Sequence, residues 1–124
     1  FMPLGVALPK LQATRGYGAE VHLIGDNFDA TLAAAREFVA ESGAMFIAPF
    51  DHLSVILGQG TVALEMLEAA PDIETIVVPI GGGGLISGVA AAARLIAERD
   101  GRSIRIVGVQ AENAASFGPS LEAG

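Results

Sequence analysis

Residues 75–91 read TIVVPIGGGGLISGVAA and contain four consecutive glycines, Gly81 to Gly84. The β-branched run ahead of the glycines favours a strand. The alanine-rich run behind them favours a helix. The chain therefore places its most flexible residues between a strand and a helix.

A glycine-rich connection between a strand and a helix is typical of anion-binding sites. In open parallel α/β sheets, ligands bind beyond the carboxyl ends of the strands. Glycines let successive backbone N–H groups approach a ligand closely, and the next helix adds free N–H donors and the positive end of its dipole. A tight turn is the purely structural alternative, but a glycine costs roughly 0.5–1 kcal/mol relative to alanine. We therefore favour a phosphate cradle built from backbone.

The residues around the glycines narrow the class of phosphate ligand. A Walker loop needs lysine and then serine or threonine after its last glycine, whereas Leu-Ile follows at 85–86, which argues against ATP. Residues 82–87, GGGLIS, match the dinucleotide motif Gly-x-Gly-x-x-Gly except at the last position, and Glu112, shortly after the next expected strand, could imitate the ribose-binding acid. A dinucleotide-binding βαβ module therefore stays an alternative. No Lys or Arg adjoins the loop, which suits a small phosphate group on a cofactor.

Composition excludes several broad classes of protein. The 124 residues are 52% hydrophobic and carry a net charge of −7, without cysteine. This indicates a folded domain, or pieces of two, with no disulfides or thiolate metal site. An acidic chain is a poor nucleic-acid binder, and no apolar run approaches the roughly 18 residues that span a bilayer. We expect a cytoplasmic protein that binds neither nucleic acid nor membrane.

Strand and helix patterns alternate along the whole chain. Asp29 is the expected N-cap of the second helix, Gly43 closes it, and Leu32, Ala35, Phe38 and Val39 form its inner face. The alternation predicts an α/β fold with an open, mostly parallel sheet and helices on both faces. We expect helices over residues 9–15, 29–42, 54–69 and 85–99, and strands over residues 20–24, 45–48, 75–79 and 104–109.

Several stretches together resemble one enzyme family. Residues 79–88, PIGGGGLISG, resemble the tetraglycine loop of threonine dehydratases and serine racemases, which are pyridoxal-phosphate enzymes of the tryptophan-synthase-β fold type. The other stretches that resemble the family, in the same order, are Met2-Pro3, PKLQATR at 9–15, GAEV at 18–21, PFDH at 49–52, GQGT at 58–61, ALE at 63–65 and VGVQAE at 107–112. The resemblance covers nearly the whole chain, and the residues of these stretches are most similar to those of biosynthetic threonine dehydratase.

The resemblance implies a cofactor, a site and a domain division. Backbone N–H groups of Gly81, Gly82, Gly83, Gly84 and Leu85 would bind the 5′-phosphate of pyridoxal phosphate. Residues 1–50 would belong to the small α/β subdomain and residues 51–124 to the large cofactor-binding subdomain, with Phe50 near the cofactor or simply in the core. The parent enzyme would convert L-threonine to 2-oxobutanoate and ammonia in isoleucine biosynthesis, or would act on serine, and would be a homo-oligomer.

The resemblance also shows which parts of such an enzyme are missing. The family's cofactor-binding lysine lies in a Ser-Phe-Lys-x-Arg-Gly motif that is absent, and the only lysine here, Lys10, lies in another segment. Without that base we expect no catalytic residue in this chain, which resembles an inactive internal fragment. Serine-racemase-like relatives bind a divalent cation at positions matching Glu112, Ser116 and Gly118, but the carboxylate is missing at Gly118, so we expect no metal site.

The remaining polar residues have ordinary structural explanations. We expect His22 to pack or face solvent and His52 to lie at a helix start. Glycines at 58 and 60 inside a helical pattern suggest that another backbone packs closely there. The arginines at 94, 99, 102 and 105 alternate with acids, so we expect a solvated face.

Overall fold

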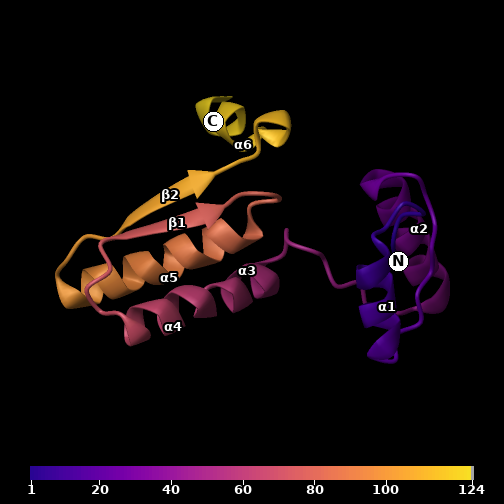
Figure 1. Cartoon of the computed structure of the whole chain (residues 1–124), viewed down its shortest axis with the longest axis horizontal. Coiled ribbons are helices and arrows are strands. Elements are labelled where there is room, and N and C mark those ends of the chain that lie inside the picture. Colours follow the sequence, from indigo (N-terminus) through magenta and orange to yellow (C-terminus); the bar gives the residue numbers. More distant parts are fainter. Residues whose placement is uncertain (124) are drawn as a thin grey trace. The chain divides into compact units, whose positions relative to one another are not determined.

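The structure is a computed structural model that describes residues 1–123. It divides into two compact units, Phe1–Ile47 and Ala48–Gly124, which we call unit 1 and unit 2. The division falls just before the predicted connection at residues 49–52. Figure 1 shows the elements of both units.

Unit 1 contains two helices, α1 (Leu8–Gly16) and α2 (Phe28–Ser42). The strand predicted over residues 20–24 is wrong, because only an isolated parallel bridge joins Met2 to Leu23. Met2 N–H donates to the carbonyl of His22 at 2.9 Å, and Ile24 N–H donates to the carbonyl of Met2 at 2.9 Å. A strand needs a paired neighbour along its length, and the described residues supply this segment with no more than this short one.

The predicted cap of helix α2 is also wrong by two residues. Asn27 is the N-cap, and its Oδ1 accepts a hydrogen bond from Ala30 N–H at 2.9 Å. Asp29 lies instead in the first turn, where its charge suits the helix dipole. Gly43 closes the helix with φ +70°, as predicted.

The buried residue of α2 is Thr31. Its hydroxyl lies within hydrogen-bonding distance of two carbonyls, those of Ile24 at 2.7 Å and Asn27 at 2.8 Å. Thr31 thus ties the helix to the preceding loop. Of the expected inner face, Leu32, Ala35 and Val39 are half-buried, whereas Phe38 is 40% exposed.

Residues 45–48 do not form the predicted strand. Met45 is 83% exposed and Ile47 is 71% exposed. No strand among residues 1–123 pairs with this segment, and an unpaired strand does not persist in water.

Unit 2 begins with two helices in place of the single predicted one. Helix α3 spans Leu53–Gln59 and helix α4 spans Thr61–Ala69. They meet at Gly60, whose N–H reaches the carbonyls of both Ile56 at 3.2 Å and Leu57 at 3.1 Å. Such shared hydrogen bonding is common at helix ends.

A βαβ arrangement follows these helices. Strand β1 (Thr75–Pro79), helix α5 (Gly84–Asp100) and strand β2 (Arg105–Val109) are consecutive. The strands pair in parallel, with Thr75 opposite Arg105 and Pro79 opposite Val109. The fold is therefore α/β with a small parallel sheet.

Helix α5 lies between the sheet and the helix pair α3 and α4, as Figure 1 shows. The core gathers where these layers meet, and it consists of Ala63, Leu67, Ile76, Val78, Val89, Ala93 and Ile96. Helices cover one face of β1 in the described residues, because Ile76 and Val78 are buried whereas Val77 is 63% exposed.

Close packing of α3 on α5 depends on two glycines. A methyl group at Gly60 would lie 3.2 Å from the carbonyl oxygen of Gly88, and one at Gly88 would lie 2.7 Å from the nitrogen of Gly60. The predicted close backbone approach is thus confirmed at Gly60. It is wrong at Gly58, where nothing lies within 4 Å.

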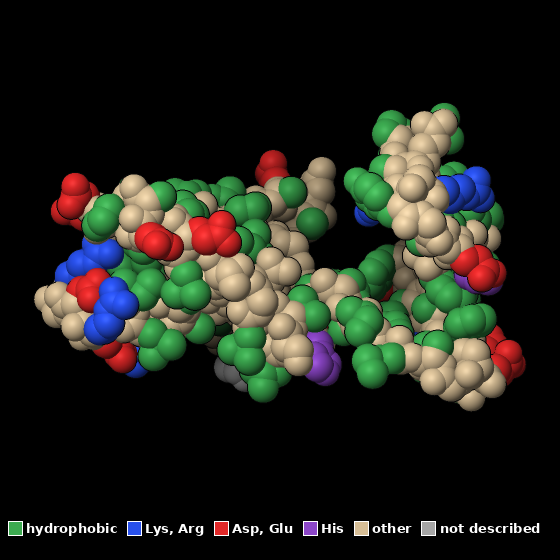
Figure 2. All heavy atoms as spheres, turned by 90° about the horizontal axis from the view of Figure 1, so that it is seen from below, with side chains coloured by type: hydrophobic (Ala, Val, Ile, Leu, Met, Phe, Trp, Pro, Cys, Tyr) green, Lys and Arg blue, Asp and Glu red, His purple; other side chains and the backbone are tan. Residues whose placement is uncertain are grey.

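Both units leave large apolar side chains on their surfaces (Figure 2). Leu8 in unit 1 is 61% exposed, and Leu53 and Leu95 in unit 2 are 69% and 68% exposed. Across residues 1–123, no helix is both long and apolar enough to span a bilayer.

Candidate functional site

The four glycines form the loop between the carboxyl end of β1 and the first turn of α5. Gly83 is the N-cap of α5 and has φ +87°, a conformation that side chains rarely adopt. Ser87 N–H donates to the carbonyl of Gly83 at 3.0 Å, and Ile80 N–H donates to the carbonyl of Val109 at 2.8 Å. The loop is thus anchored to α5 at one end and to β2 at the other.

Two phenylalanines pack directly against this loop. A methyl group at Gly82 would overlap the ring of Phe50, and one at Gly84 would lie 2.7 Å from the carbonyl oxygen of Phe50. A methyl group at Gly83 would lie 3.1 Å from Cε2 of Phe117. Glycine is therefore required at 82, 83 and 84 by shape, whereas Gly81 has nothing within 4 Å.

The loop presents backbone donors that are available to a ligand. Within residues 1–123, the N–H groups of Gly81, Gly82 and Gly83 donate to no other group. The first N–H groups of α5, beginning at Gly84, have no partner inside the helix, and the helix dipole places its positive end there. This arrangement favours an anion such as a phosphate.

A cavity of about 320 Å³ opens beside the loop. Its volume lies in the usual range for small-molecule sites, roughly 300–1,000 Å³. Among the described residues its lining is apolar side chains, glycine backbone and the amide of Gln59, without Lys or Arg: Pro49, Phe50, Val55, Gln59, Pro79, Gly81, Gly82, Gly83, Gly84 and Leu85. A ring with one phosphate group fits this chemistry, because the walls take the ring and the backbone donors take the charge.

The structure brings all five predicted phosphate-binding residues to one cavity. Gly81 and Gly82 are exposed, Gly83 and Gly84 are buried, and Leu85 is half-buried. Phe50 is half-buried and lines the same cavity.

Lys10 lies elsewhere in the fold. It is an exposed residue of α1, which belongs to unit 1. In the described part of the chain, the cavity lining contains no lysine, histidine or carboxylate that could move a proton. The lining is therefore suited to binding rather than to proton transfer.

Other candidate residues have structural roles. His52 is the N-cap of α3, as predicted, and its Nδ1 accepts from Ser54 N–H at 3.2 Å. His22 packs its ring on Phe1, with 4.7 Å between ring centroids. Glu112 opens a short 3-10 helix, η1 (Glu112–Ala114). Among residues 1–123, no cluster of three His, Cys, Asp or Glu side chains could hold a metal ion.

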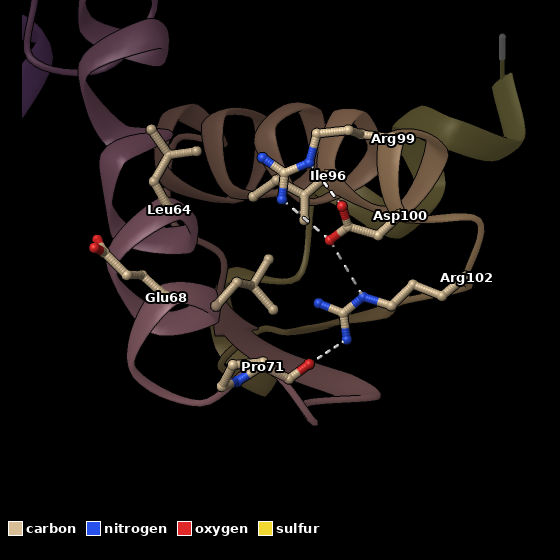
Figure 3. Close-up of a pocket in the computed structure, with 8 residues that line it drawn as sticks. Leu64, Glu68, Pro71, Ile96, Arg99, Asp100 and Arg102 are labelled. Carbon is tan, nitrogen blue, oxygen red and sulfur yellow. Dashed lines mark hydrogen bonds and ion pairs between the residues drawn. The ribbon is translucent and has the colours of Figure 1, made fainter.

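A second cavity of about 500 Å³ lies at the other end of α5. Figure 3 shows the guanidinium groups of Arg99 and Arg102 directed at the carboxylate of Asp100. The nearest nitrogen–oxygen distances are 2.6 Å for Arg99 and 4.0 Å for Arg102. Hydrogen bonds from Arg99 lower the pKa of Asp100, and the same contact raises the pKa of Arg99. These charges compensate one another and leave little attraction for a charged ligand.

Arg102 corrects one expectation about the arginines. Its side chain is only 27% exposed. Its guanidinium donates to the carbonyl of Pro71 and, at 3.2 Å, to the carbonyl of Ile73. Arg102 therefore holds the segment that leads into β1, whereas Arg94 pairs with Glu98 on the surface at 2.9 Å, as expected.

Sequence reasoning missed Phe117, which packs on Gly83, and Gln110, which accepts a hydrogen bond from Phe117. Phe117 belongs to helix α6 (Phe117–Ala123), and its N–H donates to Oε1 of Gln110 at 3.0 Å. The pattern VGVQAE was noted for its resemblance, but no local signal indicates that a ring seven residues beyond Gln110 returns to Gly83.

Comparisons with known proteins agree with this geometry. L-threonine dehydratase catabolic TdcB of Escherichia coli is 46% identical over 123 residues, which are 99% of this chain and 36% of that protein. L-Threonine dehydratase biosynthetic IlvA of Salmonella typhimurium is 42% identical over 99% of this chain and 23% of its own length. The solved structure of maize serine racemase superimposes with a TM-score of 0.89 at 38% identity, over 98% of this chain and 36% of that one.

The chain thus spans about a third or less of the relatives that it matches. Residues 1–124, the entire chain, match the family model described as "Pyridoxal-phosphate dependent enzyme". This chain therefore belongs to the family of pyridoxal-phosphate dependent enzymes.

Proposed function

We propose that Gly81, Gly82, Gly83, Gly84 and Leu85 bind the 5′-phosphate of pyridoxal phosphate through their backbone N–H groups. The observation that carries this proposal is the loop itself: packing against Phe50 and Phe117 requires glycine, while the N–H groups of residues 81–83 donate to no other group within residues 1–123. The role of these residues is to hold the phosphate by dipoles, since no cationic side chain lines the cavity.

The chemistry of the bound cofactor is stabilisation of negative charge at the α-carbon of an amino acid. This chain supplies binding and orientation for that chemistry. It does not supply the proton-transferring base, because Lys10 is exposed on α1 and the cavity lining holds no titratable side chain. We therefore expect the chain alone to be inactive.

For a longer protein that carries this chain, we propose the reaction L-threonine to 2-oxobutanoate and ammonia. The support is the identity to threonine dehydratases, 46% and 42% over nearly the whole chain. A serine dehydratase or racemase is the alternative, supported by the fold similarity to maize serine racemase. Relative kcat/KM for threonine and serine, measured on such a protein, decides between them.

The narrower proposal is the biosynthetic role, in which 2-oxobutanoate leads on to isoleucine. Its support is the similarity to biosynthetic IlvA, and the similarity to catabolic TdcB supports the alternative. If a longer protein that carries this chain restores growth of an isoleucine-requiring bacterial strain that lacks its own threonine dehydratase, the proposed reaction is supported in either case. Inhibition of the purified enzyme by isoleucine would favour the biosynthetic role.

Three further features of the longer protein are part of the proposal. Residues 1–50 belong to a small subdomain and residues 51–124 to a large cofactor-binding subdomain; the support is that the two compact units divide nearby, between Ile47 and Ala48. The protein is a cytoplasmic homo-oligomer. The exposed apolar surfaces are consistent with further protein contacts.

The test is a fluorescence titration of the chain with pyridoxal phosphate, beside pyridoxal without the phosphate. We expect saturable binding that needs the phosphate and is competed by inorganic phosphate. A Lys10→Arg variant removes the only lysine and therefore the reaction of its side-chain amine with the aldehyde. Gly84→Ala should abolish the phosphate-dependent part, whereas Gly16→Ala, where nothing lies within 4 Å, should not. Equal, non-saturating reaction with both compounds would contradict the proposal.

A further inference from the structure

The segment that follows β2 folds back onto the glycine loop. Gln110 comes directly after β2, and its amide contacts two backbone groups of the next turn. Oε1 accepts from Phe117 N–H at 3.0 Å, and Nε2 donates to the carbonyl of Ala114 at 3.3 Å. One side chain therefore joins η1 to the start of α6.

This connection places the Phe117 ring against Gly83. A methyl group at Gly83 would lie 3.1 Å from Cε2 and 3.8 Å from Cδ2 of that ring. Phe117 is half-buried. Gly83 is also the residue with φ +87°, so the ring packs on the most unusual backbone conformation of the loop.

Neighbouring residues must restrict the conformation of the loop, because glycines have little conformational preference of their own. Phe50 packs on Gly82 and Gly84, and Phe117 packs on the residue between them. The carbonyl of Val109, the residue before Gln110, accepts from Ile80 N–H at 2.8 Å. Residues 109–117 thus restrain both the start and the middle of the loop.

We propose that Gln110 and Phe117 are positioning residues that hold the tetraglycine loop in its phosphate-binding shape. This inference rests on the proposed function of the loop. An ordered loop binds more tightly because the apparent dissociation constant rises as the binding-competent fraction falls. Gln110 acts through Phe117, and Phe117 acts through Gly83, so neither needs to touch the cofactor.

The first experiment measures order in the loop without any ligand. Ser87 N–H donates to the carbonyl of Gly83 at 3.0 Å, so its hydrogen exchange by NMR reports whether the loop holds its shape. We expect Phe117→Ala and Gln110→Met to speed this exchange about tenfold, since local opening exposes the amide. Phe117→Tyr keeps the ring and should restore slow exchange. Leu121→Ala, which truncates a 71% exposed residue of the same helix, is the matched control.

The second experiment titrates the same variants with pyridoxal phosphate and with pyridoxal. Phe117→Ala and Gln110→Met should weaken the phosphate-dependent affinity about tenfold, with little change for pyridoxal or for the thermal midpoint of unit 2. If all variants exchange at Ser87 like wild type, or if Leu121→Ala matches Phe117→Ala, the inference is overturned. If exchange responds as expected but wild type shows no phosphate-dependent binding, the proposed function fails while the ordering of the loop by these residues stands.

Discussion

The close packing of α3 on α5 supports the glycine loop, and a substitution at this contact tests that support quantitatively. Gly88 lies one turn after Gly84, so a shift of α5 at this crossing also moves the glycine loop. A methyl group at Gly88 would lie 2.7 Å from the nitrogen of Gly60 and 2.9 Å from Cβ of Gln59, and it would overlap the carbonyl oxygen of Ile56. Two of these three neighbours are backbone atoms of the facing helix, which cannot move by a simple rotation.

We expect Gly88→Ala to destabilise unit 2 by about 1–2 kcal/mol. Overpacking of a tight contact costs about 1–3 kcal/mol, and backbone neighbours place this site in the upper part of that range. Replacing glycine by alanine inside a helix returns about 1 kcal/mol. Gly58→Ala is the matched control, because Gly58 lies within α3 and nothing is within 4 Å of its missing side chain. It should stabilise the chain by up to about 1 kcal/mol.

The two variants share the same gain in helix propensity, so their difference isolates packing. Urea unfolding followed by circular dichroism gives the free energy of unfolding for each. We expect Gly88→Ala to lie about 2–3 kcal/mol below Gly58→Ala, which is the upper part of the cost of overpacking, and to bind pyridoxal phosphate more weakly. Equal stability of the two variants would refute the reasoning that these glycines allow the helices to approach.

Three more predictions concern other contacts. Asn27→Ala should destabilise α2 by about 1 kcal/mol because the N-cap hydrogen bond is lost, and Asp29→Ala should destabilise it by less. Thermal melts in which Asp29→Ala has the larger effect would contradict the assignment of Asn27 as the N-cap. Arg102→Met should destabilise unit 2 by about 1–3 kcal/mol, since two carbonyls lose a charged donor; a change as small as that of Arg94→Met, on the exposed face, would contradict this. Because the folded state lowers the pKa of Asp100, the ionised carboxylate stabilises the fold at pH values above its unfolded pKa of about 4. This stabilisation is lost as the pH falls through the folded pKa. The difference in Tm between wild type and Asp100→Asn should therefore disappear in acid, and a difference that persisted at pH 2 would count against it.

Local sequence determined the elements that carry the site. The β-branched run of β1, the glycines and the alanine-rich α5 each favour one conformation through their own backbone preferences. Their order alone placed residues 81–85 at the carboxyl end of a parallel strand, where they are found. Gly43 and Gly101 end their helices at positive φ for the same local reason.

Tertiary structure decided what depends on distant partners. The segments at 20–24 and 45–48 have strand-like patterns, but a strand forms only where another backbone pairs with it. The break at Gly60 accompanies the approach of Gly88, and the packing of Phe50 and Phe117 on the loop joins residues far apart in the chain. Sequence patterns report the preferences of neighbouring residues, whereas the shape of the glycine loop is set by side chains that only folding brings to the glycines.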